Sequence, residues 1–228
     1  MEAIVLAGGF GTRLRAVVPD VSKPMAPIAG KPFLEILLGA LSRKGFTRAI
    51  LSLGFMSETI TGHFGNRFAD MDLDYMVEEV PLGTGGAVRL ALTKCVADHV
   101  YVFNGDTYLD LEVAAVEAHW QAHRLPIIVG REVPDTSRFG RLLTEAGMVT
   151  GFAEKGLNGS GLINAGCYVM NRGQLDAFAI NSPFSLESDY FVQVVASAAI
   201  EVFVTRGHFI DIGIPEDYAR AQSELGSY

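Results

Sequence analysis

Short apolar runs alternate with amphipathic segments along the first half of the chain. The runs are rich in Val, Ile, Leu and Phe, which is typical of buried strands, and they lie at residues 3–7, 49–53, 73–77 and 100–103. In the segments between them apolar residues recur every three or four positions, which predicts helices at residues 33–44, 58–64, 86–95 and 111–123. Alternating strands and helices indicate a parallel α/β sheet with helices on both faces, and such sheets bind ligands at the carboxyl ends of their strands.

The pattern changes near residue 126, where helices give way to strands joined by turns. Apolar runs predict strands at residues 126–131, 140–144, 148–154 and 163–170, with a hairpin turn at Glu145-Ala146-Gly147. A helix over residues 186–196, a strand over 200–204 and a terminal helix over 215–225 follow. We therefore expect a single domain over residues 1–228, in which an α/β half at residues 1–125 is joined to a smaller α+β lobe at residues 126–228.

Composition and charge favour a compact cytoplasmic protein. With 228 residues, of which 49% are hydrophobic and 19% charged, the chain can bury a full core. The net charge of −8 argues against a nucleic-acid surface, which needs concentrated Lys and Arg. The run at residues 3–7 is too short to cross a membrane, and no cationic segment precedes it as in a signal peptide. Cys95 and Cys167 suit a reducing compartment and are interpreted as small buried residues.

A glycine-rich loop follows the first predicted strand, with the sequence Gly8-Gly9-Phe10-Gly11-Thr12-Arg13-Leu14. Glycines let backbone N–H groups converge on phosphate oxygens, and the side chains of Arg13 and Lys23 add positive charge. The spacing matches neither the Rossmann fingerprint nor the Walker A loop. A simple tight turn is the alternative, but such a turn has no need of Thr12 and Arg13. We therefore predict a polyphosphate-binding loop.

Two aspartates follow apolar runs at distant points of the chain. Asp106 ends the segment Val102-Phe103-Asn104-Gly105-Asp106, and Asp211 precedes Ile212-Gly213 shortly before the last predicted helix. Carboxylates brought together from two strands can hold a hard cation such as Mg²⁺, with substrate phosphates completing its shell. The alternatives are an Asn-Gly-Asp turn for Asp106 and a helix cap for Asp211.

Two further groups of residues suit a base and a sugar phosphate. The turn Leu82-Gly83-Thr84-Gly85-Gly86 lets a flat base lie against the backbone, and Glu78 can accept hydrogen bonds from guanine N1–H and its exocyclic amine. An ordinary loop with solvated acids is the alternative there. Glu154, Lys155 and Asn164 supply a carboxylate, an ammonium and an amide for sugar hydroxyls and a phosphate.

His119 and His123 stand four residues apart on a predicted helix, which is the spacing of many zinc ligands. No third ligand lies nearby in the sequence, and the helix is amphipathic. We therefore expect a solvated helix face at these histidines rather than a metal site.

An ordered set of motifs resembles those of the sugar-1-phosphate nucleotidyltransferases: L-A-G-G-F-G-T-R-L, S-K-P-M, P-L-G-T-G-G, N-G-D, E-K-G, N-A-G and D-I-G-x-P-E-D-Y. The resemblance runs from about Glu2 to Tyr218. Residues 30–35, 79–87 and 184–189 are most similar to the branch that joins GTP to a heptose 1-phosphate for bacterial capsule or lipopolysaccharide. The resemblance to the family implies a GT-A-like, Rossmann-type mixed sheet flanked by helices. Nucleotide is then expected to bind to residues 1–125 and sugar phosphate to the smaller α+β lobe at residues 126–228.

The resemblance also implies roles for individual residues. The catalytic cations of the family match Arg13 and Lys23, and its Mg²⁺ ligands, also catalytic, match Asp106 and Asp211. Besides the two cations, its nucleotide-binding positions match Leu6, Ala7, Gly8, Gly9, Gly11, Thr12, Glu78, Gly83, Asn104 and Gly105. Its sugar-phosphate positions match Gly140, Glu154, Lys155, Asn164 and Gly166. Ile214 departs from the family, in which a small polar residue is common at this point.

The implied reaction is attack by the sugar 1-phosphate oxygen on the α-phosphorus of GTP, with loss of pyrophosphate and no covalent enzyme intermediate. Other members of the family use mannose 1-phosphate with GTP, or glucose 1-phosphate with UTP or dTTP, and these alternatives stay open. A non-catalytic nucleotide-sugar sensor would lack the catalytic cations or carboxylates, whereas this chain has both. A homodimer is an expectation from family habit.

Overall fold

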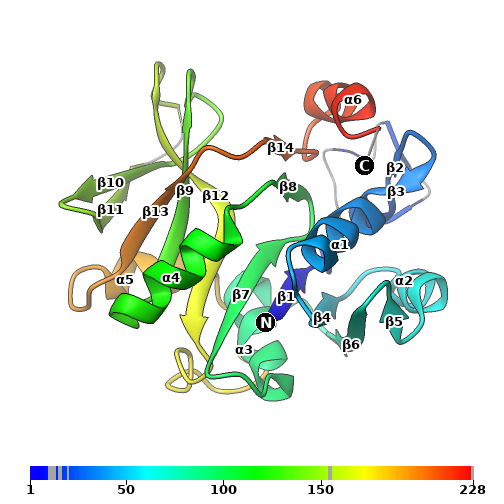
Figure 1. Ribbon diagram of the computed structural model, residues 1–228, viewed down its shortest axis with the longest axis horizontal. Coiled ribbons are helices and arrows are strands. Elements are labelled where there is room, and N and C mark those ends of the chain that lie inside the picture. The colour runs from blue at the N-terminus through cyan, green and yellow to red at the C-terminus, as the bar shows by residue number, and fades with distance from the viewer. Residues whose placement is uncertain (10–13, 15–16, 20, 154–155, 227–228) are drawn as a thin grey trace.

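Ten strands form one mixed sheet (Figure 1). The computed structural model describes residues 1–9, 14, 17–19, 21–153 and 156–226. The strand order is β10-β11-β13-β9-β12-β7-β1-β4-β6-β5. The strands from the first half of the chain are β1 (Glu2–Leu6), β4 (Arg48–Leu53), β5 (Arg67–Phe68), β6 (Met71–Val77) and β7 (His99–Asn104). Those from the second half are β9 (Ile127–Val133), β10 (Arg141–Glu145), β11 (Met148–Ala153), β12 (Gly161–Asn171) and β13 (Glu201–Thr205).

The central strands β7, β1, β4 and β6 are parallel, so the predicted α/β sheet is confirmed. Helices cover both of its faces, which is why these strands are apolar almost throughout. Val5 belongs to the core on the face of α1 (Phe33–Arg43), α2 (Ser57–Phe64) and α4 (Val113–His123). Ile4, its neighbour, belongs to the core on the opposite face, with α3 (Gly83–Ala91) and the segments η3 (Leu92–Lys94), η4 (Leu186–Phe191) and α5 (Val192–Val194).

The second half of the chain continues the same sheet. β12 pairs antiparallel with β7 on one side and with β9 on the other, so it joins the strands of both halves. The predicted hairpin between β10 and β11 is confirmed. Ala146 and Gly147 have φ values of 49° and 81°, the left-handed conformation that a two-residue hairpin turn requires.

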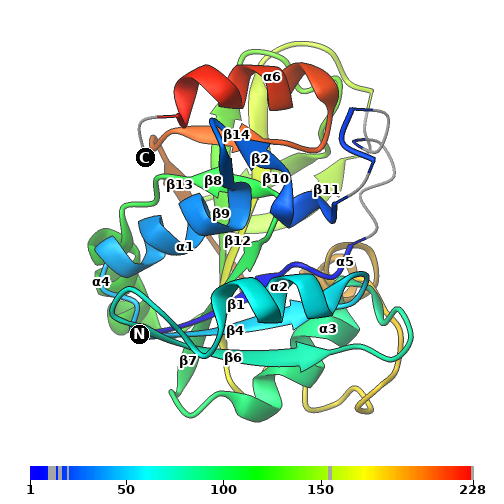
Figure 2. The same ribbon diagram turned by 90° about the vertical axis from the view of Figure 1, so that its right-hand side faces the viewer.

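A third, smaller core lies under α6 (Pro215–Glu224). Figure 2 shows α6 stacked over β14 (Phe209–Asp211) and near the hairpin of β2 (Pro27–Ile28) and β3 (Lys31–Pro32). β14 pairs antiparallel with β8 (Thr107–Leu109), which directly follows the turn after β7. Tyr108, Ile210 and Tyr218 are buried together in this core, and the Tyr218 hydroxyl donates to the Pro27 carbonyl at 2.6 Å. The core thus holds β8 and β14 in place, the two strands that adjoin Asp106 and Asp211.

The long predicted elements agree with the structure, and the main correction concerns residues 186–196. That segment is a π-helical turn, η4, followed by the short helix α5, which ends at Val194. The strands β2, β3, β5, β8 and β14 were not predicted. Cys95 and Cys167 are buried as expected, and burial raises the pKa of the Cys95 thiol to about 12. Within the described residues, no helix is long and apolar enough to span a membrane.

Candidate functional site

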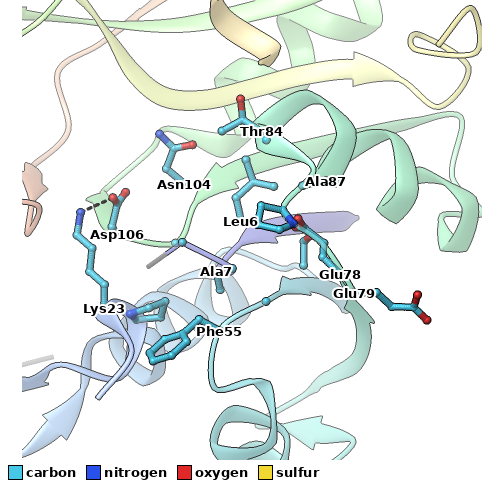
Figure 3. Close-up of a pocket in the computed structure, with 18 residues that line it drawn as sticks. Leu6, Ala7, Lys23, Phe55, Glu78, Glu79, Thr84, Ala87, Asn104 and Asp106 are labelled. Carbon is cyan, nitrogen blue, oxygen red and sulfur yellow. Dashed lines mark hydrogen bonds and ion pairs between the residues drawn. The ribbon is translucent and has the colours of Figure 1, made fainter. Parts of the chain in front are cut away.

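A cavity of about 490 Å³ lies at the carboxyl ends of β1 and β7 (Figure 3). From β1 the order of strands leads to β4 on one side and to β7 on the other. The cavity therefore lies at the topological switch point, where open α/β sheets bind their ligands. Leu6-Ala7-Gly8-Gly9 and Asn104-Gly105-Asp106 line it from the two strands, and Phe55, Pro81 and Ala87 add apolar walls.

Gly105 allows the ends of β1 and β7 to approach each other. Its N–H donates to the Leu6 carbonyl at 2.9 Å. A Cβ at this position would lie 2.6 Å from the same oxygen and 3.1 Å from the Ala7 Cα, so any larger residue would force the two segments apart. The glycine of the N-G-D motif is therefore what permits Asn104 and Asp106 to line the cavity.

Lys23 connects two carboxylates at one end of the cavity. Its Nζ forms an ion pair with Asp106 and lies 3.8 Å from Asp211 Oδ1, as Figure 3 shows for the first pair. The backbone of Lys23 is set by a 3₁₀ turn, η2 (Lys23–Met25), whose second residue is the buried Pro24. One ammonium against two carboxylates leaves a local excess of negative charge. The hard oxygen atoms of Asp106 and Asp211 suit a divalent cation such as Mg²⁺.

Asp211 reaches this position through the short ladder between β8 and β14. In that ladder Asp211 lies opposite Thr107, and the Ile212 N–H donates to the Asp106 carbonyl at 3.0 Å. The Gly213 N–H donates to Asp211 Oδ1 at 2.7 Å. A Cβ on Gly213 would lie 2.9 Å from Lys23 Nζ, so the glycine of the D-I-G motif leaves room for the ammonium.

Glu78 lies across the cavity from Lys23 (Figure 3). The Leu82 N–H donates to Glu78 Oε2 at 2.9 Å, and the Ser52 hydroxyl donates to Oε1 at 3.3 Å. These bonds hold the carboxylate beside the glycine turn at the start of α3. Each carboxylate oxygen can accept more than one hydrogen bond, so Glu78 can still accept from a ligand. Glu79, the next residue, also lines the cavity, but its side chain is exposed and points away from Glu78 (Figure 3).

A hydrogen-bond relay links the glycine turn to β12. The Thr84 hydroxyl donates to Glu187 Oε2 at 2.6 Å, and the Tyr168 hydroxyl donates to Glu187 Oε1 at 2.9 Å. Burial, and then the nearby Glu187 carboxylate, hold the pKa of Tyr168 well above its usual value, so this hydroxyl stays protonated. Tyr168 also accepts from Asn164 Nδ2 at 2.7 Å, and Asn164 Oδ1 accepts from the Gly166 N–H at 2.9 Å. The relay thus connects cavity-lining Thr84 to two predicted sugar-phosphate residues.

The predicted site residues fall into three groups. Those that line the cavity are Leu6, Ala7, Gly8, Gly9, Lys23, Glu78, Gly83, Asn104, Gly105 and Asp106. Those that lie elsewhere are Asp211 beside Lys23, Asn164 and Gly166 on β12, and Gly140, where an added Cβ would lie 3.2 Å from the Ala153 carbonyl oxygen. Gly11, Thr12, Arg13, Glu154 and Lys155 lie outside the described residues.

Sequence reasoning missed Gly54, Phe55, Tyr168 and Glu187. Gly54 and Phe55 line the cavity just after β4, where the backbone of Gly54 packs against Gly8. A glycine directly after the second apolar run was the available signal. Glu187 belongs to the segment 184–189 that resembles the heptose branch, but its bond to Tyr168 forms only where β12 and η4 meet, so neither residue could be assigned a role.

The helix face at His119 and His123 is partly solvated as expected, but the expectation that no third ligand lies nearby is wrong. Both imidazoles contact the carboxylate of Glu201, which is buried at the first residue of β13. The third side chain comes from a strand far along the sequence, which is why spacing along the helix could not reveal it.

The chain is similar to known proteins over nearly its full length. The profile of the nucleotidyl transferase family matches residues 2–227. A D-glycero-alpha-D-manno-heptose 1-phosphate guanylyltransferase from Aneurinibacillus thermoaerophilus is 38% identical over 229 residues, which cover 100% of both chains. A protein of the same name from Campylobacter jejuni subsp. jejuni serotype O:2 is 36% identical over 219 residues, which cover 96% of this chain and 97% of that one.

A solved structure has the same fold. It is the crystal structure of HddC from Yersinia pseudotuberculosis complexed with GMP-PN, which matches with a TM-score of 0.88 and 36% sequence identity. The match covers 98% of this chain and 99% of that chain. The expected mixed sheet flanked by helices is therefore confirmed both by the strand order and by this likeness.

Proposed function

The chain belongs to the nucleotidyl transferase family, and from this premise we propose that it transfers a guanylyl group from GTP to D-glycero-α-D-manno-heptose 1-phosphate. The products are GDP-heptose and pyrophosphate. Two relatives that carry this activity in their names match over almost the entire chain, and the structural relative was solved with GMP-PN. Bacterial capsule or lipopolysaccharide synthesis is the process that we propose for the product.

The convergence of Lys23, Asp106 and Asp211 beside the cavity is the observation that carries this proposal. A reaction between two phosphate groups must overcome the repulsion between anions and the entropy of aligning them. A site for it needs cations near the reacting phosphates and carboxylates that can retain a metal ion. A nucleotide sensor could bind its ligand with the glycine backbone alone and would have no use for the buried ammonium.

We assign Lys23 to the α-phosphate of GTP, because its ammonium adjoins the cavity and is held rigidly by two carboxylates. Asp106 and Asp211 would hold Mg²⁺. When bound, this ion would neutralise charge on the phosphates of both substrates. Arg13 is proposed to stabilise the leaving pyrophosphate and Lys155 to hold the incoming phosphate, on the basis of their match to the family motifs.

Glu78 is the residue that we propose to select guanine. Its carboxylate is oriented by Leu82 and Ser52 and faces the cavity, where it can accept from guanine N1–H and the exocyclic amine. Adenine presents a different edge, with an acceptor in place of N1–H. The sugar phosphate is proposed to bind near Asn164 and Gly166, which the relay joins to Thr84.

Incubation with each nucleoside triphosphate and a panel of sugar 1-phosphates, followed by measurement of pyrophosphate, tests the proposal. The expected result is the highest kcat/KM for GTP with the heptose 1-phosphate, and turnover that depends on Mg²⁺. A preference for mannose 1-phosphate, or for UTP or dTTP with glucose 1-phosphate, would show that the chain has the activity of another member of the family. Absence of pyrophosphate with every pair would contradict an enzymatic role and favour a nucleotide-sugar sensor.

A further inference from the structure

Three side chains of types that ligate metals meet at the amino end of β13, whereas the cavity lies at the carboxyl ends of β1 and β7. Glu201 is the first residue of β13 and pairs with Ile127, the first residue of β9. β9 and β7 are both antiparallel to β12, so β13 runs in the same direction as β7. Glu201 therefore lies at the amino end of its strand, whereas the cavity lies at the carboxyl ends. Figure 1 shows α4, which carries His119 and His123, on the β9–β13 side of the molecule.

The geometry of this cluster suits one ion. His119 and His123 are one helical turn apart, and a ring nitrogen of each approaches the same carboxylate. His119 Nε2 lies 3.0 Å from Glu201 Oε2, and His123 Nδ1 lies 2.7 Å from Glu201 Oε1. One ligand atom from each residue can be chosen so that all three lie within 4.8 Å of one another. Tetrahedral zinc with ligands at about 2.0–2.1 Å separates them by roughly 3.4 Å, so small side-chain rotations suffice.

The bonding of Glu201 indicates that a cation is needed. Glu201 is only 4% exposed. Its Oε2 and His119 Nε2 are both buried, and neither has a partner of suitable hydrogen-bond geometry within the described part of the chain, although they lie 3.0 Å apart. A buried carboxylate oxygen without a donor is costly, and so is a buried ring nitrogen without a partner. An ion between the two atoms would satisfy both.

Protonated imidazoles are the other source of positive charge, and they account for the cluster less well. Direct pairing would have to join His119 Nε2 to Glu201 Oε2, but these two buried atoms lack the geometry of a hydrogen bond although they lie 3.0 Å apart. A metal ion instead uses neutral imidazoles together with the carboxylate, which is the His₂Glu set found at zinc sites. The His123 side chain is 48% exposed, so an ion can enter from solvent and retain a water ligand.

We propose that His119, His123 and Glu201 bind a divalent transition-metal ion of the Zn²⁺ class, separately from the Mg²⁺ site proposed above. Mixed imidazole and carboxylate ligands favour such ions over Mg²⁺, which prefers oxygen ligands alone. The ion joins the last turn of α4 to the start of β13. Its role is to stabilise the packing of α4 against β13, because it crosslinks two elements that are distant in sequence.

Calorimetric titration of the chelator-treated, full-length protein with Zn²⁺ tests the proposal, with excess Mg²⁺ present to occupy oxygen-only sites. We expect one Zn²⁺ to bind per chain and the melting temperature to rise with Zn²⁺ concentration. His123→Ala should weaken Zn²⁺ binding by roughly 100-fold, because it removes one of three protein ligands. This histidine is exposed, so its loss leaves the core intact.

His208→Ala is the matched control, since His208 also pairs with a glutamate, Glu224, at 2.7 Å. It should leave Zn²⁺ binding unchanged. Glu201→Gln provides a second test, because it keeps the shape of the buried side chain and should also abolish the Zn²⁺-dependent rise in melting temperature. Equal Zn²⁺ affinity in the wild type and His123→Ala would overturn the proposal. So would a Zn²⁺ anomalous signal in crystals that appeared only at Asp106 and Asp211.

Discussion

Lys23 is the side chain whose removal should separate catalysis from folding. Its ammonium lies between Asp106 and Asp211 and adjoins the cavity, so Lys23→Ala leaves two carboxylates facing each other without their cation. We expect turnover to fall by roughly 100-fold or more, and the same for Asp106→Ala, if both groups act in the transition state. Steady-state kinetics and circular dichroism of the variants measure the two effects.

Lys44→Ala is the appropriate control for that experiment. Lys44 forms an ion pair with Asp110 at 2.6 Å, so the substitution removes a comparable contact away from the cavity. Its turnover should equal that of the wild type. Near-normal rates in Lys23→Ala would remove Lys23 from the reaction and leave it a purely structural role.

Glu78 carries the choice of base in the proposed function. Glu78→Gln keeps an oxygen for the Leu82 N–H but replaces the other with an amide donor, which opposes the N1–H and amine of guanine. We expect the preference for GTP over ATP to fall by about 10-fold or more, measured as the ratio of kcat/KM values. Glu58→Gln changes an exposed carboxylate that does not line the cavity and should leave that ratio unaltered. A constant ratio in both variants would place base recognition on other residues.

At the scale of elements, the relay from α3 to β12 couples the two sides of the site. Glu187 accepts from both Thr84 and Tyr168, and Glu187→Gln presents an amide where one of these donors now bonds. We expect kcat/KM to fall by about 10-fold, mainly through higher KM values for both substrates, because a positioning residue is lost. The melting temperature should change little by comparison.

Asp189→Asn tests whether any change in this segment has the same effect. Asp189 accepts from the Ser185 N–H at 2.7 Å within the same turn, but it takes no part in the relay. The KM values of Asp189→Asn should equal those of the wild type. A rise in KM for only one substrate in Glu187→Gln would show that the relay does not join the two sides.

Sequence patterns predicted the elements that contain long apolar runs, but they did not predict short strands whose pairing partners are distant in sequence. β1, β4 and β7 were recognisable because each is a continuous buried run, and α1 because Pro32 and Gly45 flank it. β8 and β14 have three residues each, too few for any period, and they are strands only because they pair with each other. Hence the motifs around Asp106 and Asp211 were visible in the sequence, but the contact between their segments was not.

At the scale of the whole molecule, an ionic cluster at the amino ends of the parallel strands should make stability depend on pH. Glu2 accepts from the Val96 and Ala97 N–H groups at 2.8 Å and from Arg48 at 2.6 Å, and Arg48 also pairs with Asp74. Burial alone would raise the pKa of Glu2, but the bonds from Ala97, Val96 and Arg48 outweigh it and lower this pKa below 4.5. The cluster thus favours the ionised carboxylate.

A lowered pKa in the folded state means that Glu2 stabilises the protein above the pKa of the unfolded chain. That contribution is lost as the pH falls from about 4.5 through the lower folded-state pKa. Glu2→Gln should therefore lower the free energy of unfolding at pH 7 by about 1–3 kcal/mol and flatten its decrease in acid. Urea unfolding between pH 3 and 7 measures both, with exposed Glu145→Gln as the control. An unchanged acid profile in Glu2→Gln would assign the acid sensitivity to other carboxylates.

The sequence also indicated that the molecule has an α/β first half and a strand-rich second half, but not how the halves join. β12 lies between β9 and β7 in one continuous sheet, an arrangement that depends on which edge each half leaves open. Apolar periods determine which face of a strand is buried, not which strand becomes its neighbour. For the same reason Glu201 could not be assigned to the helix that carries His119 and His123.

The ladder between β8 and β14 also has a consequence for the order of folding. β1, β4, β6 and β7 are complete once the first half of the chain has been synthesised, whereas β14 lies close to α6, the last helix. Contacts between segments so far apart in sequence close a long loop and form slowly. A chain growing from its amino terminus therefore assembles the cavity strands first and joins Asp211 to Asp106 near the end. By this sequence of events, the strands that line the cavity come together well before the segment that carries Asp211 reaches them.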